Sequence, residues 1–228
     1  MTAENSTKSA IGSVVDSLEQ QIIFGSLLPK QRLYEDEFIV RYGAKRHVIR
    51  AALQELERRG IVERIPNRGA IVKFYSRQDV ADLYVVRAIL HEAGAQRIGL
   101  PADPVWLAAL KDTQAAHSAA IAAEDLAAVF RTNTLFHRKL FEGTRNAYLV
   151  EAIEQSNSKT HGIRSHGLGV PRLLAQAERE HLGMIACIEA GDRAGLTDLC
   201  LCHMDAARQF YEEKYCAPVQ LETGAAQV

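Results

Sequence analysis

The sequence has few of the features that mark membrane-bound, secreted or low-complexity chains. No stretch approaches the ~18 consecutive apolar residues of a membrane helix, and the first thirty residues carry no basic start followed by an apolar run. Glycine and proline account for only 15 and 6 of the 228 residues, which excludes a low-complexity chain. With 47% hydrophobic and 24% charged residues, the chain can bury a core. We therefore expect a globular cytoplasmic protein without a membrane segment.

Cysteines are also scarce, and their spacing matches no common framework. The chain has four, namely Cys187, Cys200, Cys202 and Cys216. This spacing fits neither a zinc knuckle nor the disulfide pattern of a secreted domain. We expect them to be small buried apolar residues.

The chain as a whole has almost no net charge, but its two parts carry net charges of opposite sign. The total is 27 Lys and Arg against 28 Asp and Glu, which by itself argues against a nucleic-acid binder. Residues 1–75, however, hold 12 basic and 9 acidic residues, whereas residues 76–228 hold 15 and 19. Between Arg41 and Lys73, nine basic residues stand against three acidic ones. This asymmetry indicates a polyanion-binding module joined to a neutral or acidic domain.

The first 75 residues have the pattern of three helices followed by a hairpin. Apolar spacing and glycine stops predict helices over about 9–24, 35–43 and 45–60. Two alternating runs, residues 61–65 and 70–74, flank the turn residues 66–69 and predict a β-hairpin. Helices in this order with a following hairpin are typical of a winged helix-turn-helix.

Basic side chains are concentrated where such a fold meets DNA. The start and outer face of the third helix are placed to contact base edges and phosphates in a major groove. The hairpin tip is narrow and positive enough for a minor groove. Basic residues are often only a solubilising surface, but their concentration on one helix and one wing favours DNA contact. The candidate DNA-binding residues are Lys45, Arg46, His47, Arg50, Arg68 and Gly69.

Three stretches carry a family resemblance: Leu28-Pro29, residues 42–62 (YGAKRHVIRAALQELERRGIV) and residues 67–72 (NRGAIV). Together they resemble the DNA-binding domain of the GntR family of bacterial transcription regulators. In that family the recognition helix usually begins Ser-Arg-Thr-Pro-Val-Arg-Glu-Ala-Leu. Arg46 and Arg50 match this pattern, whereas Lys45, His47, Val48 and Ala51 stand at substituted positions. The resemblance implies DNA contacts by the two matching arginines and by the Arg68-Gly69 tip.

From residue 76 onward the pattern predicts helices alone. Helices are expected over about 80–98, 104–122, 125–142, 147–162, 171–190 and 193–215. The expected fold is therefore mainly α, with a winged helix-turn-helix over residues 1–75 and an all-helical bundle over residues 76–228.

Three histidines of the bundle, His137, His181 and His203, lie on helix faces that should point inward. A single buried histidine is usually a satisfied core residue. Three on separate helices each need a polar partner, and one divalent metal ion would satisfy them all. Asn133 lies one helical turn before His137, so its carbonyl oxygen is a fourth candidate ligand.

Residues 133–137 (NTLFH) with His181 and His203 also resemble the FCD effector domain of the FadR branch of GntR regulators, as do residues 79–87 (DVADLYVVR). That domain often carries Asp-x-x-x-His and two later histidines as metal ligands. Asn133 stands where Asp is more usual, so we expect weaker metal binding or more charge left for an anionic ligand. The resemblance implies a divalent transition metal, zinc with nickel as the alternative, and a small organic acid as effector.

Arg87 and Arg164 are the candidate effector-binding residues. A guanidinium group can hold the second end of an acid by charge-assisted hydrogen bonds. For Arg87, a structural ion pair is an equal alternative.

These observations predict a homodimeric transcription regulator, a repressor, whose affinity for a palindromic operator in double-stranded DNA is controlled by the effector. The alternative is a ligand-independent architectural DNA-binding protein. A metal-dependent hydrolase is less well supported, because no carboxylate base shares the inner faces of Asn133, His137 and His203. We therefore do not expect an enzyme.

Overall fold

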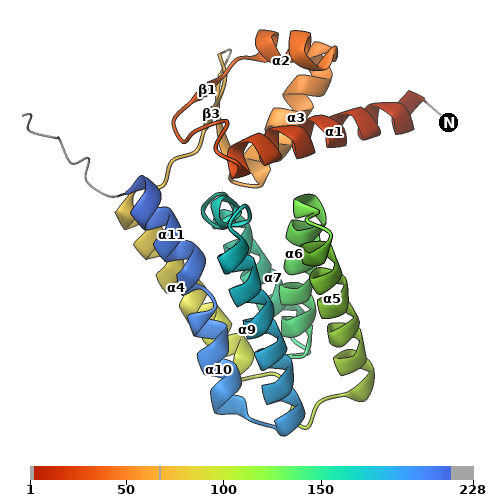
Figure 1. The fold of residues 1–228 in the computed structure, drawn as a ribbon, viewed down its shortest axis with the longest axis vertical. Coiled ribbons are helices and arrows are strands. Elements are labelled where there is room, and N and C mark those ends of the chain that lie inside the picture. The colour runs from red at the N-terminus through yellow and green to blue at the C-terminus, as the bar shows by residue number, and fades with distance from the viewer. Residues whose placement is uncertain (1–2, 67, 217–228) are drawn as a thin grey trace, which may run out of the picture.

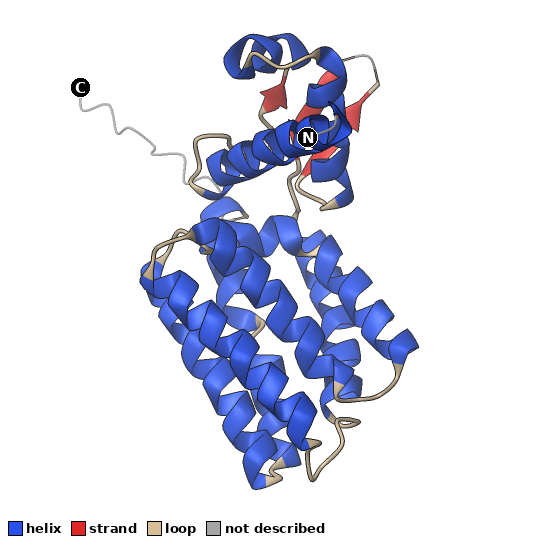
Figure 2. Ribbon diagram, turned by 90° about the vertical axis from the view of Figure 1, so that its right-hand side faces the viewer, coloured by secondary structure: helices blue, strands red, loops and turns tan. Residues whose placement is uncertain are grey.

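The computed structural model describes residues 3–66 and 68–216, with side chains from residue 9 onward. A small unit of helices and strands sits on one end of a bundle of long helices (Figures 1 and 2). Within the described ranges, no helix is long and apolar enough to cross a membrane.

The N-terminal unit has the predicted helices and hairpin. Its elements are α1 (Ala3–Ile23), β1 (Arg32–Leu33), α2 (Glu35–Tyr42), α3 (Arg46–Arg58), β2 (Val62–Ile65) and β3 (Gly69–Val72). Two features differ from expectation: α1 begins earlier, and β1 pairs antiparallel with β3 to give the sheet order β1-β3-β2. Strand β1 has only two residues, which is too short to show a sequence alternation.

The core of this unit is formed by the facing sides of α1 and α3. Leu18 and Ile22 from α1, and Ile49, Leu53 and Leu56 from α3, are each at most 1% exposed. When these apolar side chains are buried, the basic side chains of α3 face solvent, because they lie on the opposite side of the helix.

The wing depends on glycine at one position. Gly69 has a φ of 86°, in the left-handed region, and a Cβ added there would collide with the carbonyl oxygen of Leu33. The residue expected to lie at the DNA-reading tip therefore also has a conformational role, since it lets β3 start against β1.

The bundle contains the predicted helices with three differences. Its elements are α4 (Arg77–Ala95), α5 (Pro104–Ala122), α6 (Leu126–Glu142), α7 (Ala147–Lys159), α8 (His161–Arg164), the 3₁₀ turn η1 (Ser165–Gly167), α9 (Pro171–Ala190), α10 (Arg193–Cys202) and α11 (Asp205–Tyr215). Helix α4 ends before Ile98, and α7 ends at Lys159 and is followed by two short turns. The third difference is that the single helix expected over 193–215 is two helices.

The break between α10 and α11 falls at a candidate metal ligand. The N–H of His203 still bonds to the carbonyl of Leu199, four residues back, but the N–H of Met204 bonds to Leu201, three residues back. A local 3₁₀ hydrogen bond of this kind interrupts an α-helix without needing glycine or proline. No sequence signal of the usual kind therefore marks the break.

The expectation of four buried cysteines is correct only for Cys200. Cys187 and Cys216 are partly exposed, and Cys202 is exposed. All four are free thiols.

A buried polar contact joins the two parts. His161 on α8 donates its Nε2 proton to Glu19 Oε1 on α1 at 2.6 Å, and Arg59 at the end of α3 donates to Glu19 Oε2 at 2.6 Å. Burial acts to raise the pKa of Glu19, but His161 and Arg59 lower it overall, so this carboxyl group is ionised. The Tyr75 hydroxyl lies 2.8 Å from the carbonyl of Gly60 and 3.0 Å from the carbonyl of Lys159 at the end of α7. The end of α3 is thus held against the bundle by a hydrogen-bonded charge.

Candidate metal centre and nucleic-acid interface

Three imidazoles from three helices meet inside the bundle. His137 on α6, His181 on α9 and His203 at the end of α10 lie with Nε2 atoms 3.1 Å apart for the 137–203 pair and 3.3 Å apart for the 181–203 pair. They form the one group of metal-ligating side chains found among the described residues. His137 is 4% exposed and His181 is fully buried. The structure therefore brings together the three histidines chosen from sequence.

The hydrogen bonds at the outer nitrogens determine which atoms carry protons. His181 Nδ1 lies 2.9 Å from Gln114 Oε1, and His203 Nδ1 lies 2.7 Å from Glu180 Oε2. Both partners are acceptors, and the Gln114 amide is oriented by its own bond to Ser118 at 3.2 Å. Both Nδ1 atoms are therefore donors, so in the neutral form of each imidazole its Nε2 atom carries a lone pair. Two lone pairs 3.3 Å apart repel unless a cation lies between them.

The spacing fits a metal ion at the common point. Bond lengths of 2.0–2.1 Å from nitrogen to a transition metal give nitrogen-to-nitrogen distances of about 3.0 Å in octahedral and about 3.4 Å in tetrahedral geometry. Burial lowers the pKa of His137 and His181 well below the ordinary value, so both are neutral imidazoles of the kind that binds metal. Gln114 and Glu180 are placed as the outer hydrogen-bond partners that metal-bound histidines require.

A small internal cavity of about 80 Å³ adjoins the cluster. Asn133, His203, Arg87 and Arg164 all line it, so the fourth candidate ligand and both candidate effector-binding arginines lie in one place. Arg87 is 1% exposed and donates from Nε to Asn157 Oδ1 at 3.1 Å, whereas its NH1 has no partner among the described residues.

Neither arginine has a carboxylate partner. Within residues 3–66 and 68–216, Arg87 and Arg164 form no ion pair, which leaves no support for a structural ion pair at Arg87. Burial and the charge of Arg87 lower the pKa of Arg164 to about 10, which keeps it protonated at neutral pH. Guanidinium charges left without an anion in a buried site are costly, so this cavity favours a bound anion.

The sequence analysis missed several residues around the cluster. Gln114, on α5, is 2% exposed, and His117, one turn later, is 1% exposed. Their positions on an inward helix face carry the same signal that identified the three histidines. Glu180 could not be selected in this way. It is the neighbour of His181 in the sequence, but its hydrogen bond is to His203, which lies at the end of the next helix.

The basic residues at the start of α3 lie at the surface, beside the wing. A surface hollow between α2, α3 and the wing is lined by Arg46, Arg50, Arg68 and Gly69, and also by Arg32, which the sequence analysis did not select. Lys45 precedes the first turn of α3, and both it and His47 are exposed. All six candidate DNA-binding residues therefore lie at the start of α3 or in the wing of one unit.

Acidic residues of α2 hold two of these arginines. Arg46 NH2 lies 2.6 Å from Asp36 Oδ1, and Arg50 Nε lies 2.9 Å from Glu35 Oε2. The side chains of Arg46 and Arg50 remain 53% and 57% exposed. Exposed ion pairs contribute only about 0–1 kcal/mol, so phosphates can replace these carboxylates at little cost.

Comparison with known proteins agrees with this architecture. Residues 82–206 match the FCD domain, and residues 10–72 match the bacterial regulatory proteins of the gntR family. An uncharacterised HTH-type transcriptional regulator, YdhC of Bacillus subtilis, is 25% identical over 150 residues, covering 65% of this chain and 67% of that protein.

Two solved structures share the fold. A transcriptional regulator GntR from Rhodococcus sp. RHA1 has a TM-score of 0.66 at 20% identity, covering 91% of this chain and 99% of that one. McbR/YncC of E. coli has a TM-score of 0.67 at 19% identity, covering 90% and 98%. The chain belongs to the GntR family of bacterial transcription regulators and carries an FCD domain. It is a transcription regulator rather than an enzyme.

Replacing His203 by alanine removes the imidazole that contacts both other members of the cluster. We expect His203→Ala to lose stoichiometric zinc or nickel binding, as measured by isothermal titration of chelator-stripped protein. Glu180→Gln should weaken binding by about 10–100-fold, because it removes the charge on the outer partner. His166→Ala, which removes a buried imidazole outside the cluster, should bind metal like the wild type. Full metal binding by His203→Ala would show that the cluster is not the site.

Proposed function

We propose that this regulator is a homodimeric repressor that binds a palindromic operator and senses a small organic acid at a divalent metal ion. The proposal divides the chain into a reader over residues 1–75 and a sensor over residues 76–228. Zinc, or alternatively nickel, would be held by Asn133, His137, His181 and His203. The observation that carries this proposal is the meeting of three Nε2 atoms beside two buried guanidinium groups that lack a carboxylate.

Charge supports an acidic effector. Three neutral imidazoles and the Asn133 amide would leave the charge of a divalent ion uncompensated, and Arg87 and Arg164 add two more positive charges. Glu180 is the one carboxylate lining the cavity, and it is bonded to His203. A metal ion with open positions would supply Lewis acidity toward a carboxylate oxygen, and the arginines would hold the opposite end.

Surface geometry supports DNA binding by α3 and the wing. Arg46, Arg50 and Arg68 border one hollow, so helix and wing can contact adjacent stretches of one duplex. Gly69 keeps the wing in place, while Lys45 and His47 lie exposed at the helix start.

Removing Arg46 or Arg50 should weaken this contact. We expect Arg46→Ala and Arg50→Ala each to cost about 1–3 kcal/mol in binding to a duplex selected by the wild-type protein from a random library. Fluorescence anisotropy at fixed salt measures the affinity. Arg97→Ala, an exposed arginine of the bundle, is the matched control and should bind like the wild type. Unchanged affinity in both α3 variants would contradict the recognition-helix assignment.

The effector proposal has a direct thermal test. In the presence of zinc, we screen two- to four-carbon mono- and dicarboxylates, a size chosen for the 80 Å³ cavity, for an increase in melting temperature. Arg87→Met should abolish the increase and retain metal binding by calorimetry, whereas the surface variant Arg97→Met should keep both. A screen in which no acid stabilises the wild-type protein would favour the ligand-independent alternative.

An unpartnered apolar surface on α4 supports the homodimer. Val85, Val86 and Ile89 share the face opposite the core and are 59%, 51% and 61% exposed. Three adjacent apolar side chains on one helix face are typical of an interaction site. Because α4 follows the reader directly, pairing of two α4 helices about a two-fold axis would set the spacing of two recognition helices.

A charge in this surface should separate the subunits. We expect Ile89→Glu to give a monomer and wild-type protein to give a dimer in sedimentation velocity, because the charge would have to be buried at the interface. Val105→Glu, at an 81% exposed apolar position on α5, should remain dimeric. A dimeric Ile89→Glu protein would place the interface elsewhere.

A further inference from the structure

His117 on α5 is a fourth buried imidazole, beside the cluster but not one of its three members. It is 1% exposed, lines the internal cavity of about 80 Å³, and has its ring centroid 5.3 Å from that of His181. Its Nε2 atom is buried and has no hydrogen-bond partner among the described residues. A buried polar atom without a partner is costly, so a molecule in the cavity that pairs with Nε2 removes that cost.

The hydrogen bonds of Thr132 determine which nitrogen of His117 carries the proton. The Thr132 hydroxyl oxygen lies 2.7 Å from the carbonyl oxygen of Ala128 and 3.0 Å from His117 Nδ1. A hydroxyl has one proton and a carbonyl oxygen can only accept, so the Thr132 proton is donated to Ala128. The Thr132 oxygen therefore accepts from His117, whose own proton lies on Nδ1. This assignment uses contacts between protein atoms alone.

The unpartnered Nε2 atom of His117 is therefore an acceptor. Burial lowers the pKa of His117 below its ordinary value, although the carboxylate of Glu178 acts in the opposite direction. The imidazole is neutral at neutral pH, and its Nε2 carries a lone pair. The other unpartnered atoms on residues of this cavity, Arg87 NH1 and Arg164 Nε, are donors.

A ligand that satisfies all of these groups must accept and also donate hydrogen bonds. Its carboxylate accepts from the arginines, but a simple carboxylate at neutral pH has no proton to donate to His117 Nε2. A hydroxyl group supplies that proton without adding charge. An ammonium group would place another positive charge beside Arg87 and Arg164, which disfavours it.

We propose that His117 is a specificity-determining residue of the internal cavity, and that the effector is a small hydroxy acid whose hydroxyl group donates to His117 Nε2. This inference rests on the proposed function, because it takes the internal cavity as the effector site. It adds a requirement for a donor group, which neither the arginines nor the imidazole cluster would impose.

Pairs of acids that differ by one hydroxyl group test the proposal. Isothermal titration of the full-length protein, with and without one equivalent of zinc, compares glycolate with acetate, and 2-hydroxypropanoate and 3-hydroxypropanoate with propanoate. We expect at least one hydroxy acid to bind about tenfold or more tightly than its parent acid, because the parent leaves Nε2 without a donor.

Two substitutions of His117 separate the roles of its nitrogens. His117→Asn keeps an amide N–H near the position of Nδ1 and removes the acceptor at Nε2, so it should bind the two acids of a pair with similar affinity. His117→Gln is the matched control, since it places a carbonyl oxygen near the position of Nε2, and it should retain most of the preference. The comparison of acids on the wild-type protein needs neither variant, so the proposal stays testable if a variant fails to fold.

The contrary results are distinguishable. Equal affinity of the wild-type protein for the acids of every pair would overturn the role of His117 and leave the effector site in place; a water molecule bound at Nε2 would give this result. An unchanged preference in His117→Asn would also overturn it. Binding of no acid of either kind would overturn the proposed effector site, and this inference with it.

Discussion

The interior of the bundle depends on one constraint: the Nε2 atoms of His137 and His181 lie 3.1 and 3.3 Å from that of His203 in a buried site. Gln114 and Glu180 accept the outer protons of His181 and His203, so in its neutral form each of these imidazoles turns a lone pair inward. A divalent cation at the common point would be held by His137, His181 and His203 and would offset this repulsion. It would also tie α6, α9 and the α10–α11 junction together, so that metal binding and bundle packing are one process.

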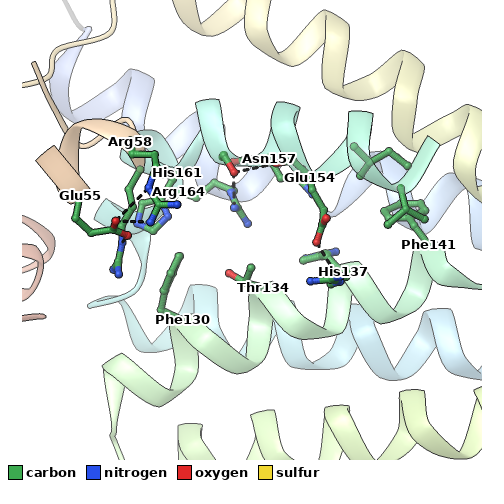
Figure 3. A pocket seen from close by; sticks show the side chains of 15 residues that line it. Glu55, Arg58, Phe130, Thr134, His137, Phe141, Glu154, Asn157, His161 and Arg164 are labelled. Atoms are coloured by element: carbon green, nitrogen blue, oxygen red, sulfur yellow. Dashed lines mark hydrogen bonds and ion pairs between the residues drawn. The ribbon is translucent and has the colours of Figure 1, made fainter. Parts of the chain in front are cut away.

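The imidazole cluster is also connected to the N-terminal unit. His137 belongs to the cluster and also lines a cavity of about 370 Å³ between α6 and α7, which Glu55 and Arg58 of α3 line as well (Figure 3). Close by, Glu19 bonds to Arg59 of the reader and to His161 of the sensor. Few side chains therefore separate the imidazole cluster from the end of α3. Reciprocal linkage then requires that a ligand which changes operator affinity is itself bound differently when DNA is present.

Much of this architecture can be predicted from the spacing of apolar residues and from the glycines and prolines at helix ends. The stripe Ile49, Leu53 and Leu56 predicts α3 and its exposed basic face, and proline at the first position marks Pro104 and Pro171 as helix starts. Inward polar residues identify His137, His181 and His203. The break after His203 could not be predicted, because it comes from one shifted backbone bond in a sequence without glycine or proline. Partners such as Glu180, and the contact of Glu19 with His161, depend on how helices are placed in space, which spacing along the chain does not encode.

The central claim is that three histidine nitrogens share one divalent ion. X-ray absorption of zinc-loaded protein measures this directly, because the first coordination shell reports ligand type and distance. The account predicts three imidazole nitrogens at about 2.0–2.1 Å with one or more oxygen ligands and no sulfur. A shell containing sulfur at about 2.3 Å, or one with fewer than three imidazoles, would contradict it.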